Sequence, residues 1–449
     1  MEQVCYGEEE RHRALDELDS LVEKGLVRVV GSGERYALLE TIRAFAAEQL
    51  HAGGEVGAIQ NAHADHYLEF AAQVAGGIFG AEQLAALRRA RAENANTLAA
   101  IHWLTSCARA GDREALEKGL LLCGYLDWYW HIGGQHLGAR GLLDALLPLA
   151  ADAPPSHGRA RAHLAAGMIT TCTDEWERSL REWGAAYNDG LAIGHPAVTA
   201  EGIMGVGYCH LHGGRMDEAR AALDEAIARS EGGVTDFILS FSLAVKGMLV
   251  FIAGDVEGGM TLVKQSKQIS DRLQDDELGG VALSFLAQMT FAKGDPASAL
   301  ELYRDALGHL EAVGDRPEIA RVHCEMGWTA LAADQTRAAL QAFRLGVLAN
   351  EEVGSPRGTG LALLGLAAVE AAEGRPERAV TIAAAAHALS ERAGVVIEHP
   401  MDPSVVKRID ALKAAIPKGI VDGLATGAGA LTPTEVLAMV ALDVSGPRG

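Results

Sequence analysis

The chain lacks most features that mark membrane, secreted or nucleotide-hydrolysing proteins. Its 449 residues contain no run of 18 apolar residues, so no membrane-spanning helix is expected. Met1 to Val4 leads into acidic residues, and no secretory signal is expected. The six cysteines are scattered without a Cys-x-x-Cys pair, which indicates reduced thiols and a cytoplasmic protein. No Gly-x-x-x-x-Gly-Lys-Ser/Thr loop is present to hold the phosphates of ATP.

Positive charge and catalytic groupings are also scarce. Lys and Arg number 39 against 60 Asp and Glu, and the net charge of −21 disfavours direct binding to a phosphate backbone. No paired carboxylates, nucleophile elbow or metal-ligand cluster is visible, so we expect neither an enzyme nor a cofactor or metal. His63 and His66 lie one helical turn apart but have no third ligand nearby, and are predicted to be an ordinary histidine pair.

What the chain does have is a 40-residue period. Turn-forming residues recur at one phase, and small residues recur seven positions before and five positions after each of them. A fixed period of this length is the signature of a stacked repeat architecture. The turn phase comprises Gly134, Asp174, Gly214, Gly254, Gly294, Asp334 and Gly374.

The spacing predicts pairs of antiparallel helices. Gly207 with Ala219 and Gly247 with Gly259 are 12 residues apart, as two helices that approach closely around a short turn require. Larger residues follow each second small residue by four, as at Leu223. This small, large, small order resembles tetratricopeptide (TPR) repeats, lengthened by about six residues from the usual 34. We therefore predict an all-α protein with a TPR-like α-solenoid over residues 119–396.

One row of this array is a candidate ligand site. A TPR-like superhelix has a concave face lined by the first helices, and the row lies one position after each first-helix small residue. Large, adaptable side chains there suit a peptide or a small effector, although packing of the row against neighbouring repeats is the more ordinary expectation. The row is Trp128, Met168, Tyr208, Met248, Gln288 and Trp328.

Residues 1–50 have the pattern of part of a winged helix. A helical stripe over 11–24 is followed by alternating strands over 26–30 and 35–39. The hairpin is either a packing element or a DNA-contacting wing. With 11 acidic against 6 basic side chains in these 50 residues, the packing role is the better expectation.

Five segments of the first 105 residues together have a recognisable order, namely Leu21–Val27, Arg35–Leu50, Gly54–Glu55, His63–Ala71 and Ala92–Leu104. They resemble a segment of the STAND class of signal-transduction ATPases, including large LuxR-type transcriptional regulators. The resemblance implies a winged helix between a nucleotide-binding module and a helical-repeat sensor. Because the P-loop and a helix-turn-helix are missing, it implies the sensor part, with an ATPase or DNA-binding chain as a candidate partner in trans.

Two further segments complete the expected organisation. Residues 51–118 form a helical bridge, and residues 397–449 supply capping helices, one over 402–416 and one after the capping box Thr432–Glu435. Near the start of the array, Trp128, Tyr129 and Trp130 are consecutive, and one helical face cannot bury all three. At least one ring of this aromatic cluster should therefore be exposed or line a groove, although core packing is the default for any single ring.

The favoured function is a non-enzymatic regulator that binds a protein partner or a small effector. It would be the TPR-like sensor part of a STAND-type transcriptional regulator. A free-standing TPR scaffold without a role in transcription is the alternative.

Overall fold

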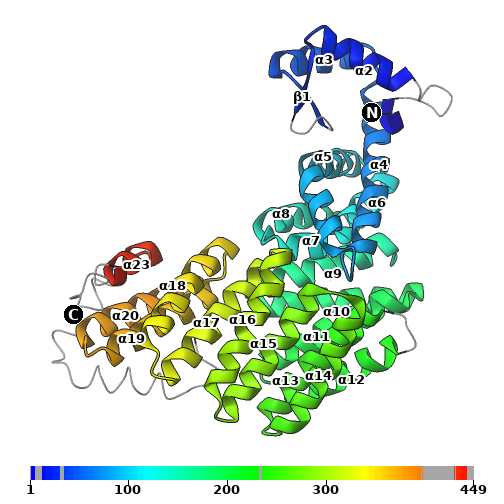
Figure 1. Ribbon diagram of the computed structural model, residues 1–449. Helices are drawn as coiled ribbons and strands as arrows, with labels where there is room; N and C mark the ends of the chain where they lie inside the picture. The colour runs from blue at the N-terminus through cyan, green and yellow to red at the C-terminus, as the bar shows by residue number, and fades with distance from the viewer. Residues whose placement is uncertain are drawn as a thin grey trace.

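The computed structural model describes residues 2–5, 13–30, 35–231, 235–395, 397, 429 and 431–441. Within these residues a single two-stranded sheet accompanies an otherwise helical chain (Figure 1). The predicted all-α class is confirmed. None of the described helices is long and apolar enough to cross a membrane. The expected helix over 402–416 lies outside the described residues.

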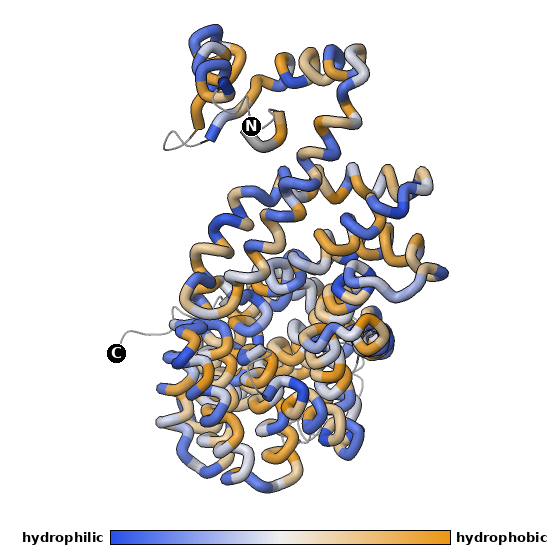
Figure 2. Tube along the Cα trace, turned by 90° about the vertical axis from the view of Figure 1, so that its right-hand side faces the viewer, coloured by the Kyte–Doolittle hydropathy of each residue, from blue (hydrophilic) through white to orange (hydrophobic). Residues whose placement is uncertain are grey.

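The N-terminal module stands apart from the rest of the molecule and has little core of its own (Figures 1 and 2). Its strands pair antiparallel with Val27 opposite Leu38, as the alternating pattern predicts. Helix α3 buries no residue, whereas α2 buries only Ala14 and Leu18. The module consists of α1 (Glu2–Cys5), α2 (Arg13–Glu23), β1 (Val27–Val30), β2 (Arg35–Leu38) and α3 (Glu40–Ala52).

A carboxylate on the bridge attaches this module. Glu93 accepts hydrogen bonds from Arg35 at 2.8 Å, Tyr67 at 2.6 Å and Asn96 at 2.7 Å, and so joins β2 to two bridge helices. The bridge and the short helices after it are α4 (Val56–Gly77), α5 (Gln83–Arg109), α6 (Arg113–Tyr125), α7 (Asp127–Ile132), α8 (His136–Leu146) and the 3-10 turn η2 (Leu147–Ala150).

Six helix pairs follow, and their boundaries keep the 40-residue period. All seven predicted turn residues have positive φ, including the non-glycine Asp174 at 63° and Asp334 at 58°. Pro296, Pro356 and Pro376 each begin a helix, as expected. The pairs are α9 (His157–Cys172) with α10 (Trp176–Ile193), α11 (Pro196–His212) with α12 (Met216–Ser230), α13 (Asp236–Ile252) with α14 (Val256–Leu273), α15 (Asp276–Ala292) with α16 (Pro296–Val313), α17 (Arg316–Ala332) with α18 (Thr336–Val353), and α19 (Pro356–Ala372) with α20 (Pro376–Ala393).

Glycines of the first helices admit the large side chains of the second. A Cβ at Gly327 would lie 2.6 Å from the Phe343 ring, and one at Gly365 of the next repeat only 2.2 Å from it. Trp183 is held in the same way between Gly167 and Gly205. The predicted small, large, small pattern is thus a slot for one ring between two adjacent repeats.

The array coils so far that its later repeats meet the bridge and the first repeat. We call these contacts the seam. They pair Gly80 N with Asp275 Oδ2 at 2.8 Å, and Asp174 Oδ2 with Ser355 Oγ at 3.1 Å. The partners are 195 and 181 residues apart, so one turn of the coil takes between four and five repeats. Helix α5 contacts α16, and α7 contacts α17.

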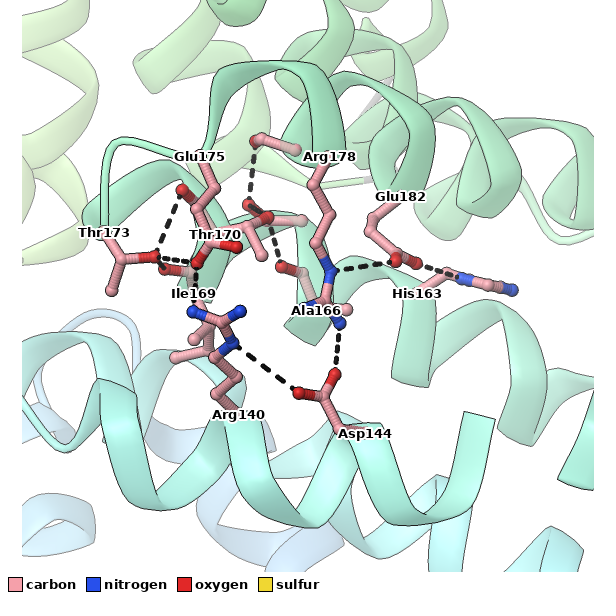
Figure 3. Close-up of polar contacts among 12 residues, drawn as sticks. Arg140, Asp144, His163, Ala166, Ile169, Thr170, Thr173, Glu175, Arg178 and Glu182 are labelled. Atoms are coloured by element: carbon pink, nitrogen blue, oxygen red, sulfur yellow. Dashed lines mark hydrogen bonds and ion pairs between the residues drawn. The ribbon is translucent and has the colours of Figure 1, made fainter. Parts of the chain in front are cut away.

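Charged side chains fix α8 to the first repeat (Figure 3). Arg140 reaches Glu175 at 2.6 Å and Asp144 at 3.6 Å, and Arg178 also pairs with Asp144. All of these side chains are partly exposed, so the network orients α8 more than it stabilises the chain.

At the C-terminal end, α23 (Pro433–Ala441) covers α20. Thr432 N donates to Glu435 Oε2 at 2.7 Å and Glu435 N donates to Thr432 Oγ1 at 3.3 Å, which confirms the predicted capping box. Val436 and Val440 are buried against the last repeat.

Candidate functional site

The predicted row is largely inside the protein. Trp128, Met168, Gln288 and Trp328 are 2–7% exposed, whereas Tyr208 and Met248 are half-buried. Trp128 donates from Nε1 to Glu201 at 3.1 Å, and its ring packs edge-on against Phe237. The binding role of the row stays a prediction, and Tyr208 and Met248 are its members that solvent can reach.

The expectation of an exposed ring among the three consecutive aromatics is wrong. Trp128, Tyr129 and Trp130 are each at most 2% exposed. They can all be buried because α7 is enclosed on several sides, with α9 against it in the first turn and α17 reaching it from the second. The prediction assumed that only one face of the helix is covered, but the seam brings α17 against a second face of α7.

Half-buried aromatic and charged side chains follow the first helices α11, α13, α15 and α17. Tyr208 and Phe241 have ring centroids 6.2 Å apart, and the Arg321 guanidinium lies 5.0 Å from the centroid of the Phe285 ring. We call this set the inner strip. It consists of Tyr208, Phe241, Met248, Phe285, Glu318 and Arg321.

Charge within the inner strip is organised around Arg321. Its Nε donates to Glu318 Oε2 at 2.9 Å and its Nη2 to Ser284 Oγ at 2.6 Å, whereas Nη1 is covered and has no hydrogen-bond partner. Burial opposes the charged guanidinium, but Glu318 and Glu325 raise the pKa of Arg321 above its ordinary value. Burial and the Glu318 carboxylate likewise raise the pKa of Tyr208. The strip thus offers aromatic faces and a fixed cation.

Deeper in the first turn lies a buried ion cluster. Arg161 is 3.5 Å from Asp127 and 3.6 Å from Glu201, two carboxylates that are nearly inaccessible to solvent. Burial, together with the Asp127 charge, raises the pKa of Glu201 to about 7. One cation between two carboxylates leaves an excess negative charge, so the cluster gains by keeping a proton.

A second polar cluster lies at the seam and combines five side chains from four parts of the chain. His131 Nδ1 is 3.1 Å from Cys172 Sγ, and His131 Nε2 is 4.0 Å from Asp315 Oδ2. His136 and Glu277 complete it, and ligand-type atoms of these residues fall within 4.8 Å of one another in two sets of three. Burial and His136 lower the pKa of His131 to about 3, whereas burial raises the pKa of Asp315 and of Glu277.

Sequence reasoning found only Tyr208 and Met248 of the inner strip and no member of the seam cluster, for different reasons. Phe241 and Arg321 lie seven residues before Met248 and Trp328, on the same helical face, so extending the row by two turns of helix would have found them. No comparable signal exists for the seam cluster, because His131 and Asp315 meet only through the accumulated rotation of the repeats.

Comparison with known proteins supports the architecture. Residues 280–346, which span α15 to α18, match the tetratricopeptide repeat. The fold is a tetratricopeptide-like α-solenoid. No curated protein matches the chain.

Solved structures with the same architecture are distant in sequence. A Rap protein complexed with competence and sporulation factor is 10% identical, with a TM-score of 0.52 over 81% of this chain and 98% of that one. Aspartyl phosphate phosphatase F from Bacillus subtilis is 11% identical, with a TM-score of 0.47 over 77% of this chain and 83% of that one. A STAND protein with a tetratricopeptide repeat sensor from Pyrococcus horikoshii is 13% identical, with a TM-score of 0.46 over 92% of this chain and 60% of that one.

Proposed function

We propose that the chain is a non-enzymatic regulatory protein that binds a protein partner or a small effector through the inner strip. The observation that carries the proposal is the strip itself. Tyr208, Phe241 and Phe285 are aromatic side chains that remain half-buried on consecutive first helices, and the Arg321 guanidinium on the next first helix lies 5.0 Å from the centroid of the Phe285 ring. Aromatic residues and arginine are the side chains most often responsible for binding energy at protein interfaces. The fold supports the proposal, since a Rap protein of similar architecture is seen in complex with a competence and sporulation factor.

We further propose that the N-terminal module transmits the bound state to other parts of a STAND-type transcriptional regulator. Support comes from the resemblance of the first 105 residues and from the apolar surface of the module. Leu15 and Phe45 are each 59% exposed, and Val29, Tyr36 and Leu39 are between 42% and 48% exposed. An apolar surface of this extent on a small module suits docking against another domain or chain. We place the winged helix at residues 1–50, the bridge at 51–118, the array at 119–396 and the cap at 397–449.

Site-specific photo-cross-linking in the source cells tests this function. A benzophenone amino acid replaces Tyr208 in one variant and Leu348 in a control, because Leu348 is 54% exposed on α18, away from the strip. We expect a discrete cross-linked product from the Tyr208 variant alone, and its loss when Arg321→Ala is added. Equal products from both positions, or none from Tyr208, would contradict binding at the strip.

The identity of the cross-linked species distinguishes a transcriptional regulator from a scaffold without a transcriptional role. An ATPase or a DNA-binding protein as the partner, captured also through the N-terminal module, supports the regulator. A partner of another kind supports a scaffold without a transcriptional role.

A further inference from the structure

The seam buries two carboxylates that have no Lys or Arg of the described residues within ion-pair distance. Glu277 on α15 and Asp315 at the start of α17 are 1% and 0% exposed, and Glu277 Oε2 and Asp315 Oδ2 have no hydrogen-bond partner. Asp315 Oδ1 caps α17 by accepting from Glu318 N at 3.0 Å, which leaves Oδ2 as the free atom. An ionised carboxylate buried in this way costs several kcal/mol unless something compensates it.

Other deeply buried acids of the described chain are compensated. Asp189 receives two hydrogen bonds from Arg159, Glu370 pairs with Arg375 at 2.5 Å, and Asp275 accepts from Gly80 and Gln83. Asp127 and Glu201 share Arg161. Glu277 and Asp315 therefore differ from the other buried acids because they lack a compensating partner, and not only because they are buried.

A histidine from the first turn of the coil is directed at the same point. Its Nδ1 lies 3.1 Å from Cys172 Sγ, so Nδ1–H can donate there and leave the Nε2 lone pair facing the carboxylates. Nε2 is 4.0 Å from Asp315 Oδ2, which is too long for a hydrogen bond. Two ligands bound about 2 Å from one metal ion, however, are separated by about 3 to 4 Å. One atom each of His131, Glu277 and Asp315 lies within 4.8 Å of the other two.

We propose that a divalent transition-metal ion of the zinc class binds at the seam between His131 Nε2, Glu277 and Asp315. Imidazole and carboxylate are ligands that suit zinc and its neighbours, and two carboxylates neutralise the charge of the ion. His131 belongs to α7 and the carboxylates to α15 and α17, so the ion joins the first turn of the coil to the second. Cys172 acts as a positioning residue by holding the His131 ring.

Metal titration of the full chain after chelator treatment tests the site, with Zn²⁺ and Co²⁺ as the probes. Calorimetry should show one ion bound per chain, and thermal unfolding should shift upward in its presence. Glu277→Gln and Asp315→Asn should each weaken binding at least about 10- to 100-fold. Both variants should fold without metal, since each removes a buried charge and an asparagine in place of Asp315 can still cap α17. Glu370→Gln is the matched control, because it alters a buried carboxylate outside the seam and should leave the affinity unchanged.

The Co²⁺ spectrum distinguishes this ligand set from the softer one formed by His131, His136 and Cys172. We expect no thiolate charge-transfer band, and Cys172→Ser should retain saturable binding. A charge-transfer band that disappears in Cys172→Ser would overturn the assigned ligands. Absence of saturable micromolar binding, or binding unaffected by both carboxylate variants, would overturn the metal site itself, without bearing on the inner strip.

Discussion

Two kinds of interface hold this coil together, one of them apolar and the other polar. Between neighbouring repeats, rings such as Phe343 fit between glycines of two first helices, and the contact is apolar and closely packed. At the seam between turns, polar groups such as Asp275, Asp315 and Asp174 meet residues one turn of the coil away. The repeat interfaces are generated by one local pattern, whereas the seam depends on the whole array. Repeat interfaces should therefore dominate stability, and the seam should decide how far the coil closes.

The largest effect is expected from overfilling a ring slot. Gly365→Ala places a methyl group 2.2 Å from the Phe343 ring, and we expect a loss of about 2 to 3 kcal/mol in unfolding free energy. Chemical denaturation measures it. Gly308→Ala on α16 is the control, since nothing lies within 4 Å of a Cβ there, and it should be neutral or stabilising by up to about 1 kcal/mol. Equal losses in both variants would contradict the slot.

Removing a seam contact should cost less, but more than an ordinary helix cap. Asp275 caps α15 through Leu278 N at 2.9 Å and also accepts from Gly80 across the seam. Asp295 caps α16 through Ser298 N at 3.0 Å and lies away from the seam. We expect Asp295→Ala to cost about 1 kcal/mol and Asp275→Ala about 1 kcal/mol more. Indistinguishable unfolding free energies would mean that the seam bond contributes nothing.

The buried ion cluster of the first turn predicts a pH effect of similar size. The pKa of Glu201 is about 7 in the folded chain against an ordinary 4.5, so the folded state holds a proton that the unfolded state has lost between these values. Wild-type stability should accordingly fall as pH rises from about 4.5 to 7. Glu201→Gln removes this component, and should gain on the order of 1 to 3 kcal/mol relative to wild type across that window. Denaturation curves of the two proteins that stay parallel with pH would contradict the assignment.

The smallest effect concerns the N-terminal module. Arg35 and Glu93 form an ion pair at 2.8 Å whose side chains are 48% and 26% exposed, so Arg35→Ala should cost at most about 1 kcal/mol. Hydrogen exchange in β1 and β2 should quicken while the array remains protected. Arg43→Ala, which breaks a pair within α3, should leave the attachment to α5 intact. Unchanged exchange in Arg35→Ala would show that the ion pair does not attach the module.

Features that depend on a short stretch of sequence could be predicted, whereas features that depend on the whole array could not. Gly134 to Gly374 mark turns that any stack of helix pairs needs, and the Thr432–Glu435 box is complete within four residues. The seam forms because each repeat is rotated slightly relative to the one before it, and this rotation accumulates over between four and five repeats. No short sequence pattern predicts the accumulated rotation. For this reason the burial of Trp128 to Trp130 was mispredicted, and His131, Glu277 and Asp315 could not be grouped.

Pulsed electron paramagnetic resonance across the seam tests the closure of the coil most directly. Spin labels replace Leu137, which is 71% exposed on α8, and Glu352, which pairs with Arg316 beside Gly134. Exposed Cys5 and the partly exposed Cys107 and Cys172 are first changed to serine. A closed coil predicts one short, narrow distance between the labels. An open array would separate them by more than four repeats at about 10 Å each, and a long, broad distribution would contradict the account.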